Sequence, residues 1–382
     1  MQSSLRATGV TLQAASISVT WSDRTVSEFA NVWLRDNLPE DRDRHSGQRL
    51  VDVLDLPAQP RIRSAAVDGD TLAIAWADEG RQSSISLDWL HRMAHFGSAP
   101  PELAKRPWRE AATLAPRRDF AWLRYPLLQT DPQARLGWLT RLLQQGIAFL
   151  AEVPQTDLAI LQAMNLVGYV PETNYGRVFD VRTVAQPENL AFSDLGLGLH
   201  TDNPYREPVP GFQALHTLVA APDGGDSLFA DGLALAEHLR ATEPEAFHVL
   251  TRTPVPFQYQ AAGADLYAER PLIELSCDGA VEAVSYNNRS IRPPRLPLAE
   301  CTAFYDAYRK FAALLREPRL QMTTRLEDGD LALFDNRRIL HGRTGFASAN
   351  HPRHLQGCYL SRDSVYSTTA VLRRQLAGGA VT

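Results

Sequence analysis

The chain is poor in cysteine. Its 382 residues include three, Cys277, Cys301 and Cys358, which lie far apart and form no Cys-x-x-Cys pair. This number and spacing exclude a disulfide framework and a structural zinc site built from cysteine ligands. We expect buried, inert thiols in a reducing, cytoplasmic compartment.

The sequence also lacks long apolar runs and a strong charge of either sign. No stretch approaches 18 uncharged apolar residues, and the first ten, MQSSLRATGV, contain no apolar signal core. The 39 Lys and Arg against 44 Asp and Glu give a net charge of −5, without the basic excess that nucleic-acid binding requires. We therefore expect a soluble, cytoplasmic protein with neither a nucleic-acid nor a membrane partner.

Length and local pattern predict two domains. Short alternating strands at 16–21, 72–76 and 83–87, with a further extended stretch towards Trp33, indicate a β-rich first domain. The proline-rich segment 98–108 has little periodicity and is typical of a linker. We place the small N-terminal domain at 1–105 and the larger domain at 106–382.

The larger domain alternates short strands with a few helices. Apolar residues recur at helical spacing in 131–150 and 297–316. Short β-prone stretches are found at 212–219, 227–230, 281–286, 331–334 and 355–360. Many short strands supported by helices predict a mainly β protein with a jelly-roll barrel and buttressing helices.

Two histidines and one carboxylate form the candidate metal site. His200 and Asp202 stand in Leu-His-Thr-Asp-Asn, where residues i and i+2 of a strand would share a face. About one such His-x-Asp or His-x-Glu is expected by chance, so this segment alone is weak evidence. His341, followed at once by Gly342 and Arg343, completes the two-histidine, one-carboxylate set that holds non-haem Fe(II) with positions left open.

A candidate anion-binding arginine follows. Arg353 lies twelve residues after His341, just before the strand predicted at 355–360. A guanidinium fork there suits the end of a dicarboxylate.

These three segments, in this order, resemble the Fe(II)/2-oxoglutarate dioxygenases of the γ-butyrobetaine hydroxylase group, which are related to the taurine dioxygenases. The segments at 32–37 (VWLRDN) and 48–50 (QRL) resemble the small β domain of that group. The resemblance implies a double-stranded β-helix, a homodimer, and hydroxylation that consumes 2-oxoglutarate and O₂. It assigns iron to His200, Asp202 and His341, and 2-oxoglutarate to Arg353, Asn189, Leu215 and Ser227.

One departure concerns zinc. Members of the group commonly carry closely spaced, zinc-binding cysteines after this Leu-Arg-Asp-Asn, whereas this chain reads LPEDRDRH at 38–45. We therefore expect no structural zinc, and His45 as an ordinary polar surface residue.

The resemblance also suggests the substrate. Four aromatic residues match an aromatic cage for a trimethylammonium group, which attracts such a cation through the ring faces: Tyr175, Phe179, Phe192 and Tyr359. The acidic end of the substrate is assigned to Tyr205, Asn287, Asn288 and Arg289. The extra donors Arg289 and Tyr205 favour 2-(trimethylamino)ethylphosphonate, giving its 1-hydroxy product, over γ-butyrobetaine, giving carnitine. Another small anion as substrate, and a non-catalytic, metal-binding cupin-like protein, remain alternatives.

Overall fold

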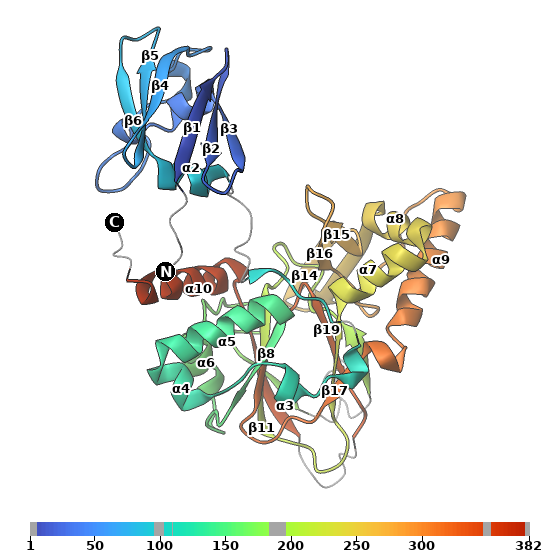
Figure 1. Ribbon diagram of the computed structural model, residues 1–382. Coiled ribbons are helices and arrows are strands. Elements are labelled where there is room, and N and C mark those ends of the chain that lie inside the picture. Colours follow the sequence, from blue (N-terminus) through green and yellow to red (C-terminus); the bar gives the residue numbers. More distant parts are fainter. Residues whose placement is uncertain (1–5, 95–102, 109, 183–195, 347–352, 379–382) are drawn as a thin grey trace. The chain divides into compact units, whose positions relative to one another are not determined.

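The computed structural model describes residues 6–94, 103–108, 110–182, 196–346 and 353–378 (Figure 1). The chain divides into two compact units, residues 1–99 and 100–381. Each unit has its own hydrophobic core.

The first unit contains two three-stranded antiparallel sheets. The first sheet has β1 (Ala7–Leu12), β2 (Ser16–Trp21) and β3 (Val26–Ala30), and the second has β4 (Ile62–Asp68), β5 (Thr71–Trp76) and β6 (Gln82–Ser86). Because successive side chains of β2 and β5 alternate between the two faces of each strand, Trp21 and Trp76 both lie in one core, as the sequence pattern predicts. The extended stretch predicted towards Trp33 is confirmed as β3, but it ends at Ala30, where the chain enters α1 (Asn31–Asp36). Helix α2 (Leu87–Ala94) follows β6.

Ion pairs connect the segment 38–45, which has no cysteines, to α1 and to the turn between β5 and β6. Arg35 contacts Asp41 at 2.6 Å and Glu79 at 2.7 Å, and Arg81 contacts Asp41 at 2.8 Å. The Arg35 side chain is 5% exposed, so these contacts are largely shielded from water. His45 is exposed, as predicted.

The second unit is a double-stranded β-helix. Its six-stranded sheet has the order β7-β8-β18-β11-β20-β9 and its four-stranded sheet the order β10-β19-β12-β17. The strands of the larger sheet are β7 (Trp122–Arg124), β8 (Ile147–Ala151), β9 (Phe179–Arg182), β11 (Phe212–Val219), β18 (Leu331–Asp335) and β20 (His354–Leu360). Those of the smaller sheet are β10 (Leu197–His200), β12 (Ser227–Asp231), β17 (Met322–Thr324) and β19 (Ile339–Arg343). This architecture confirms the predicted jelly-roll fold.

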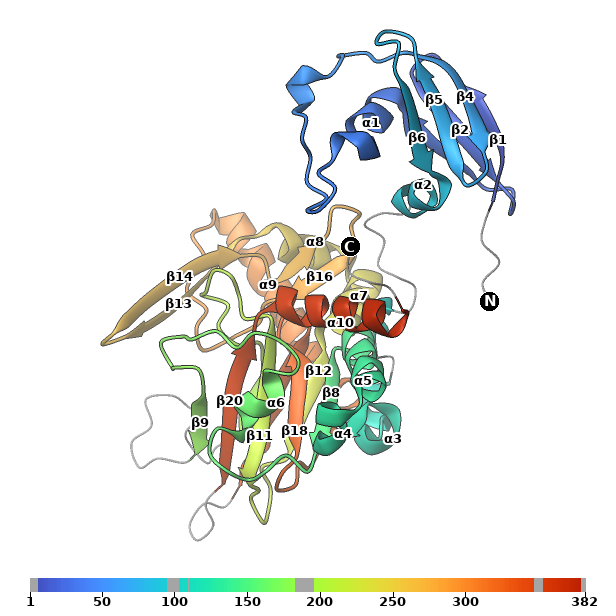
Figure 2. The same ribbon diagram turned by 90° about the vertical axis from the view of Figure 1, so that its left-hand side faces the viewer.

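Helices cover the outer faces of this unit. One group packs on the six-stranded sheet: α4 (Tyr125–Thr130), α5 (Pro132–Gln145), α6 (Ala159–Met164) and α10 (Arg362–Leu376) (Figures 1 and 2). A second group packs around the hairpin of β15 (Ile273–Leu275) and β16 (Val281–Val284): α7 (Gly232–Thr242), α8 (Pro244–Arg252) and α9 (Leu298–Leu314). Further elements are α3 (Pro116–Asp119) and the hairpin of β13 (Val255–Ala261) and β14 (Ala264–Arg270).

The helix predicted over 131–150 ends earlier than expected. Asp131 caps its first turn through a 3.0 Å hydrogen bond to the Ala134 N–H, but Gly146 takes φ +80° and stops the helix. The following apolar residues form β8, which is buried between β7 and β18. The helix predicted at 297–316 is confirmed as α9.

Apolar side chains fill only one end of the space between the two sheets. Phe149 of β8, Phe229 of β12 and Phe334 of β18 pack there, with the Phe229 and Phe334 ring centroids 5.6 Å apart. The other end, between β9, β20 and β11 on one side and β10 and β19 on the other, contains a cavity. The fold therefore places a cavity directly beside a rigid aromatic core.

Two further expectations concern the thiols and the membrane. Cys358 is buried, but Cys301 is only partly buried and Cys277 is exposed, so the prediction of three buried thiols is wrong. None of the helices in the described ranges is long and apolar enough to span a bilayer.

Candidate active site

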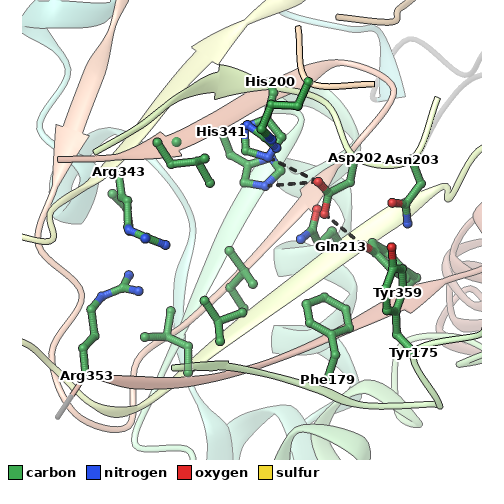
Figure 3. Close-up of a pocket in the computed structure, with 17 residues that line it drawn as sticks. Tyr175, Phe179, His200, Asp202, Asn203, Gln213, His341, Arg343, Arg353 and Tyr359 are labelled. Carbon is green, nitrogen blue, oxygen red and sulfur yellow. Dashed lines mark hydrogen bonds and ion pairs between the residues drawn. The ribbon is translucent and has the colours of Figure 1, made fainter. Parts of the chain in front are cut away.

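The three predicted metal ligands converge at one end of the cavity (Figure 3). His200 is the last residue of β10 and pairs directly with His341 of β19. Asp202 Oδ1 lies 3.2 Å from His200 Nε2 and 4.0 Å from His341 Nε2. Candidate ligand atoms of the three side chains all lie within 4.8 Å of one another. This separation suits a single cation.

Hydrogen bonds orient these side chains. His200 Nδ1 lies 2.9 Å from the Gly198 carbonyl oxygen, which leaves Nε2 free for a metal. Asp202 lies beyond the end of β10, so the expected strand alternation does not bring it beside His200. Instead, the Asn336 side chain holds the backbone of Asp202. It accepts a hydrogen bond from the Asp202 N–H at 2.7 Å and donates one to the Asp202 carbonyl oxygen at 2.9 Å. The Tyr359 hydroxyl donates to Asp202 Oδ2 at 2.8 Å.

The protonation states fit Fe(II). Burial lowers the pKa of His341 to about 3, so its imidazole is neutral near pH 7. Burial opposes ionisation of Asp202, but hydrogen bonds with His200 and Tyr359 and the electrostatic effect of the two histidines lower its pKa below the usual range. Two imidazoles and one carboxylate, with the cavity open beside them, form the donor set of a non-haem Fe(II) site.

The cavity is partly open to solvent and brings most of the predicted site residues together. Besides the three candidate ligands, it is lined by Tyr175, Phe179, Leu215, Ser227, Arg289, Arg353 and Tyr359. Asn189 and Phe192 lie outside the described residues.

One side of the cavity is cationic. Arg353 is 8% exposed and lies near Ser227 and Leu215 in the cavity wall. Burial, together with the nearby charge of Arg343, lowers the pKa of Arg353 to about 10, so it remains protonated at neutral pH. Figure 3 shows the two guanidinium groups on the side of the cavity away from the aromatic residues. This arrangement suits the distal carboxylate of 2-oxoglutarate.

Aromatic rings line the other side. The Phe179 and Tyr359 ring centroids are 5.2 Å apart, and those of Tyr175 and Phe179 are 6.4 Å apart. The ring of Tyr259 of β13, which does not line the cavity, lies behind them with its centroid 5.7 Å from that of Tyr175 and 5.3 Å from that of Tyr205. Tyr205 does not line the cavity, because it is buried behind this group.

The two predicted asparagines have other contacts. Asn287 donates from Nδ2 to the Thr201 carbonyl at 3.0 Å and accepts from the Arg289 N–H at 3.2 Å. Asn288 is exposed and accepts from the Tyr308 hydroxyl at 3.1 Å. Neither lines the cavity, so the structure does not place them with Arg289 as substrate contacts.

Sequence reasoning also missed three polar residues of the cavity wall. Arg343 follows the candidate ligand His341 by two positions, and Asn203 directly follows Asp202. Gln213 lies two positions before Leu215, on the same face of β11. The last two positions could have been found, since one adjoins a metal ligand and the other shares a strand face with a predicted residue.

Comparison with known proteins identifies the family. Residues 120–359 match the taurine catabolism dioxygenase TauD, TfdA family, and residues 10–91 match the gamma-butyrobetaine hydroxylase-like N-terminal family. The chain is 35% identical to gamma-butyrobetaine dioxygenase of Pseudomonas sp. strain AK-1, over 94% of each chain. It is 29% identical to the human gamma-butyrobetaine dioxygenase, over 95% of this chain and 96% of that one.

A solved structure of a putative alpha-ketoglutarate-dependent taurine dioxygenase from Burkholderia xenovorans gives a TM-score of 0.48 and 17% identity, covering 61% of this chain and 85% of that one. The family match favours an enzyme over the alternative of a non-catalytic cupin-like protein. The chain therefore belongs to the TauD, TfdA family and is an Fe(II)- and 2-oxoglutarate-dependent dioxygenase with a gamma-butyrobetaine hydroxylase-like N-terminal region.

Proposed function

We propose that this dioxygenase hydroxylates a short acid that carries a trimethylammonium group. The observation that carries the proposal is the set of aromatic rings, Tyr175, Phe179 and Tyr359, that lines the cavity on the side opposite Arg353 (Figure 3). A quaternary ammonium group cannot donate a hydrogen bond, so ring faces and shape must recognise it. Arg289 in the same wall supplies a cation for the acidic end.

The residues of the chain bind and aim the reactants. Iron with 2-oxoglutarate and O₂ supplies the oxidising chemistry when bound, and His200, Asp202 and His341 would hold the metal. Arg353 would hold the far carboxylate of 2-oxoglutarate. The rings and the acid-binding groups would together fix which methylene faces the metal, where an error of about 1 Å could cost on the order of 10²-fold in rate.

γ-Butyrobetaine is the first candidate substrate. Relatives that match nearly the whole chain are named gamma-butyrobetaine dioxygenase, in a bacterium at 35% identity and in humans at 29%. These matches support the carboxylate more than the phosphonate favoured by the sequence pattern.

The second candidate is 2-(trimethylamino)ethylphosphonate, which Arg289 favours. Arg289 lines the cavity and is also exposed to solvent. A phosphonate carries more charge and one more oxygen than a carboxylate, so it gains more from a permanent cation.

Direct competition between the two acids tests the proposal. Purified enzyme with Fe(II), 2-oxoglutarate and O₂ should produce succinate and add one oxygen to the preferred acid, measured by mass spectrometry. 4-Aminobutyrate, which keeps the acid but lacks the methyl groups, is the control. Equal turnover of 4-aminobutyrate and γ-butyrobetaine would contradict the aromatic cage. Arg289→Ala should reduce phosphonate turnover more than carboxylate turnover.

A further inference from the structure

Gly357 leaves a gap in a row of side chains that face the cavity. Arg353, just before β20, and Leu355 and Tyr359 on it all line the cavity. Alternation along a strand places position 357 on the same face, where glycine offers no side chain. Gly357 does not have the positive φ that would require glycine, and glycine inside a strand lowers stability. Its presence there therefore indicates a close approach by another group.

The ring of Phe179 fills this gap. Phe179 of β9 pairs directly with Gly357, so the two residues share the inner face of the sheet. A Cβ added to Gly357 would lie 2.4 Å from both Cε2 and Cζ of the Phe179 ring, far inside van der Waals contact. Strand β9 is an edge of the six-stranded sheet, where an aromatic ring that covers a glycine on the neighbouring strand stabilises the pairing. The ring therefore occupies the space that a side chain at position 357 would need.

Side-chain contacts hold β9 against β20 beside this pair. Asp180 Oδ1 accepts a hydrogen bond from Gln356 Nε2 at 3.2 Å and lies 2.8 Å from His354 Nε2. Gln356 is only 2% exposed, so its hydrogen bond is shielded from water. These contacts, together with the strand pairing, oppose separation of the two strands. A methyl group added at Gly357 would therefore displace the ring of Phe179 and not the strand that carries it.

A ring displaced from β20 moves towards the aromatic side of the cavity. The Phe179 ring centroid lies 5.2 Å from that of Tyr359 and 6.4 Å from that of Tyr175. Figure 3 shows these three side chains together on one side of the cavity. Because β20 lies behind the Phe179 ring, movement away from that strand would narrow the space between the rings. The cationic end of the substrate would lose that space.

We propose that Gly357 determines specificity for the size of the cationic head group, because its missing side chain lets the Phe179 ring lie against β20. The space this leaves accommodates three methyl groups on the substrate nitrogen. Gly357 acts through the ring and does not itself contact the substrate. A side chain at this position would favour a head group with fewer methyl groups. The inference rests on the proposed function, since it assumes that the aromatic rings bind a trimethylammonium group.

Binding of head groups of different size tests the proposal. γ-Butyrobetaine and 4-(dimethylamino)butyrate differ by one methyl group on the nitrogen, and both are cationic at that end near pH 7. Calorimetry on the full chain loaded with Mn(II) and 2-oxoglutarate gives the two dissociation constants without turnover. We expect Gly357→Ala to weaken binding of γ-butyrobetaine by roughly 10-fold or more, as for overpacking, and binding of the dimethyl acid by less than about 3-fold.

Further measurements distinguish an effect through the ring from damage to the strand. Phe179→Ala removes the ring, so adding Gly357→Ala to it should change either dissociation constant by less than about 2-fold. The affinity of the Mn(II)-loaded chain for 2-oxoglutarate should stay normal in Gly357→Ala, whereas a distorted β20 would also move the adjoining Arg353. Gly9→Ala is the matched control, because an added Cβ in β1 meets nothing closer than 4.0 Å, and it should bind every ligand as the wild type does.

The outcomes separate this inference from the proposed function. Equal losses for the two acids in Gly357→Ala, no loss for either, or a loss that persists without the Phe179 ring would overturn the role of Gly357 while the proposed function stands. A parallel loss of 2-oxoglutarate affinity would overturn it too. If Gly357→Ala alone does not fold, a folded double variant supports the inference, and failure of both to fold overturns it. If the wild type bound no trimethylammonium acid, the proposed function would fail, and this inference with it.

Discussion

At the scale of single residues, Tyr359 links the aromatic wall to the metal site. Its hydroxyl donates a 2.8 Å hydrogen bond to Asp202 Oδ2, and its ring lies beside Phe179. Groups that hydrogen-bond a metal ligand fix its orientation, and their loss typically costs 10–100-fold in metal affinity. We expect Tyr359→Phe to weaken Fe(II) binding about 10-fold, measured by competition with a chelator under anaerobic conditions. Tyr175→Phe, whose lost hydroxyl contacts Tyr205 instead, should keep the wild-type affinity.

His216 should make stability depend on pH. It is fully buried in β11, and burial lowers its pKa to about 4, from 6.5. The unfolded chain therefore takes up a proton below about pH 6.5 that the folded chain resists, so stability is complete above that pH and falls as the pH drops towards about 4. The slope should approach 1.4 kcal/mol per pH unit.

Urea unfolding at several pH values between 4 and 7 measures this effect. His216→Leu should show a shallower pH dependence than the wild type, by up to about one proton. Other buried histidines, such as His341, contribute equally to both proteins and cancel from the difference. Identical slopes would show that His216 does not titrate differently in the folded and unfolded chains.

Residue identity alone predicted the metal site better than the substrate site. The candidate metal ligands are residue types that commonly bind metals, and the order of their segments in the chain is specific: His200, Asp202 and His341. Asn287 and Asn203 are the same residue type, yet the Asn287 amide donates to a backbone carbonyl, while the Asn203 Nδ2 has no hydrogen-bond partner among the described residues. This difference depends on tertiary hydrogen bonds, which a sequence does not display.

At the scale of elements, the close approach of β10 and β19 brings the two histidines together. A Cβ added to Gly342 would lie 2.4 Å from the Leu197 carbonyl oxygen, so this pairing needs glycine next to His341. Gly342→Ala must separate the strands and the histidine rings, whose centroids are 4.3 Å apart. We expect it to weaken metal binding by at least 10-fold, as for loss of ligand orientation.

Gly198→Ala provides the matched control for that substitution. It lies in β10, two residues before His200, and an added Cβ there meets nothing within 4 Å. Binding of Co(II) or anaerobic Fe(II), followed by calorimetry, should be nearly normal in Gly198→Ala and strongly impaired in Gly342→Ala. Equal affinities in the two variants would contradict the requirement for close strand approach.

The strands of the second unit were predictable where β-prone residues form short runs between turn residues, and the segment around Gly146 shows the limit. The predicted strand 212–219 matches β11, because its residues alternate between the helix-packed face and the interior. Apolar residues at 147–150 fit a helix as well as a strand, and only the left-handed Gly146 separates the two. Such short apolar runs are ambiguous by periodicity alone.

At the scale of the whole molecule, the two units have separate cores, whereas the candidate ligands for metal and 2-oxoglutarate lie in the second unit alone. A ligand that binds only the folded form of one unit stabilises that unit by mass action. At 100 times its dissociation constant the gain is ~2.7 kcal/mol. Ligand binding should therefore act unequally on the two units.

Differential scanning calorimetry of the full chain measures this inequality. Mn(II) with 2-oxoglutarate occupies the site without turnover and should raise the melting temperature of the second unit by a few degrees. Each kcal/mol shifts a domain of 150–250 residues by ~2–4 °C, and a larger unit such as this one by less. The transition of the first unit, built around Trp21 and Trp76, should stay in place. His200→Ala removes a metal ligand and should abolish the shift. An equal shift of both transitions in the wild type would mean that the units unfold together, so that metal binding in the second unit stabilises the first as well.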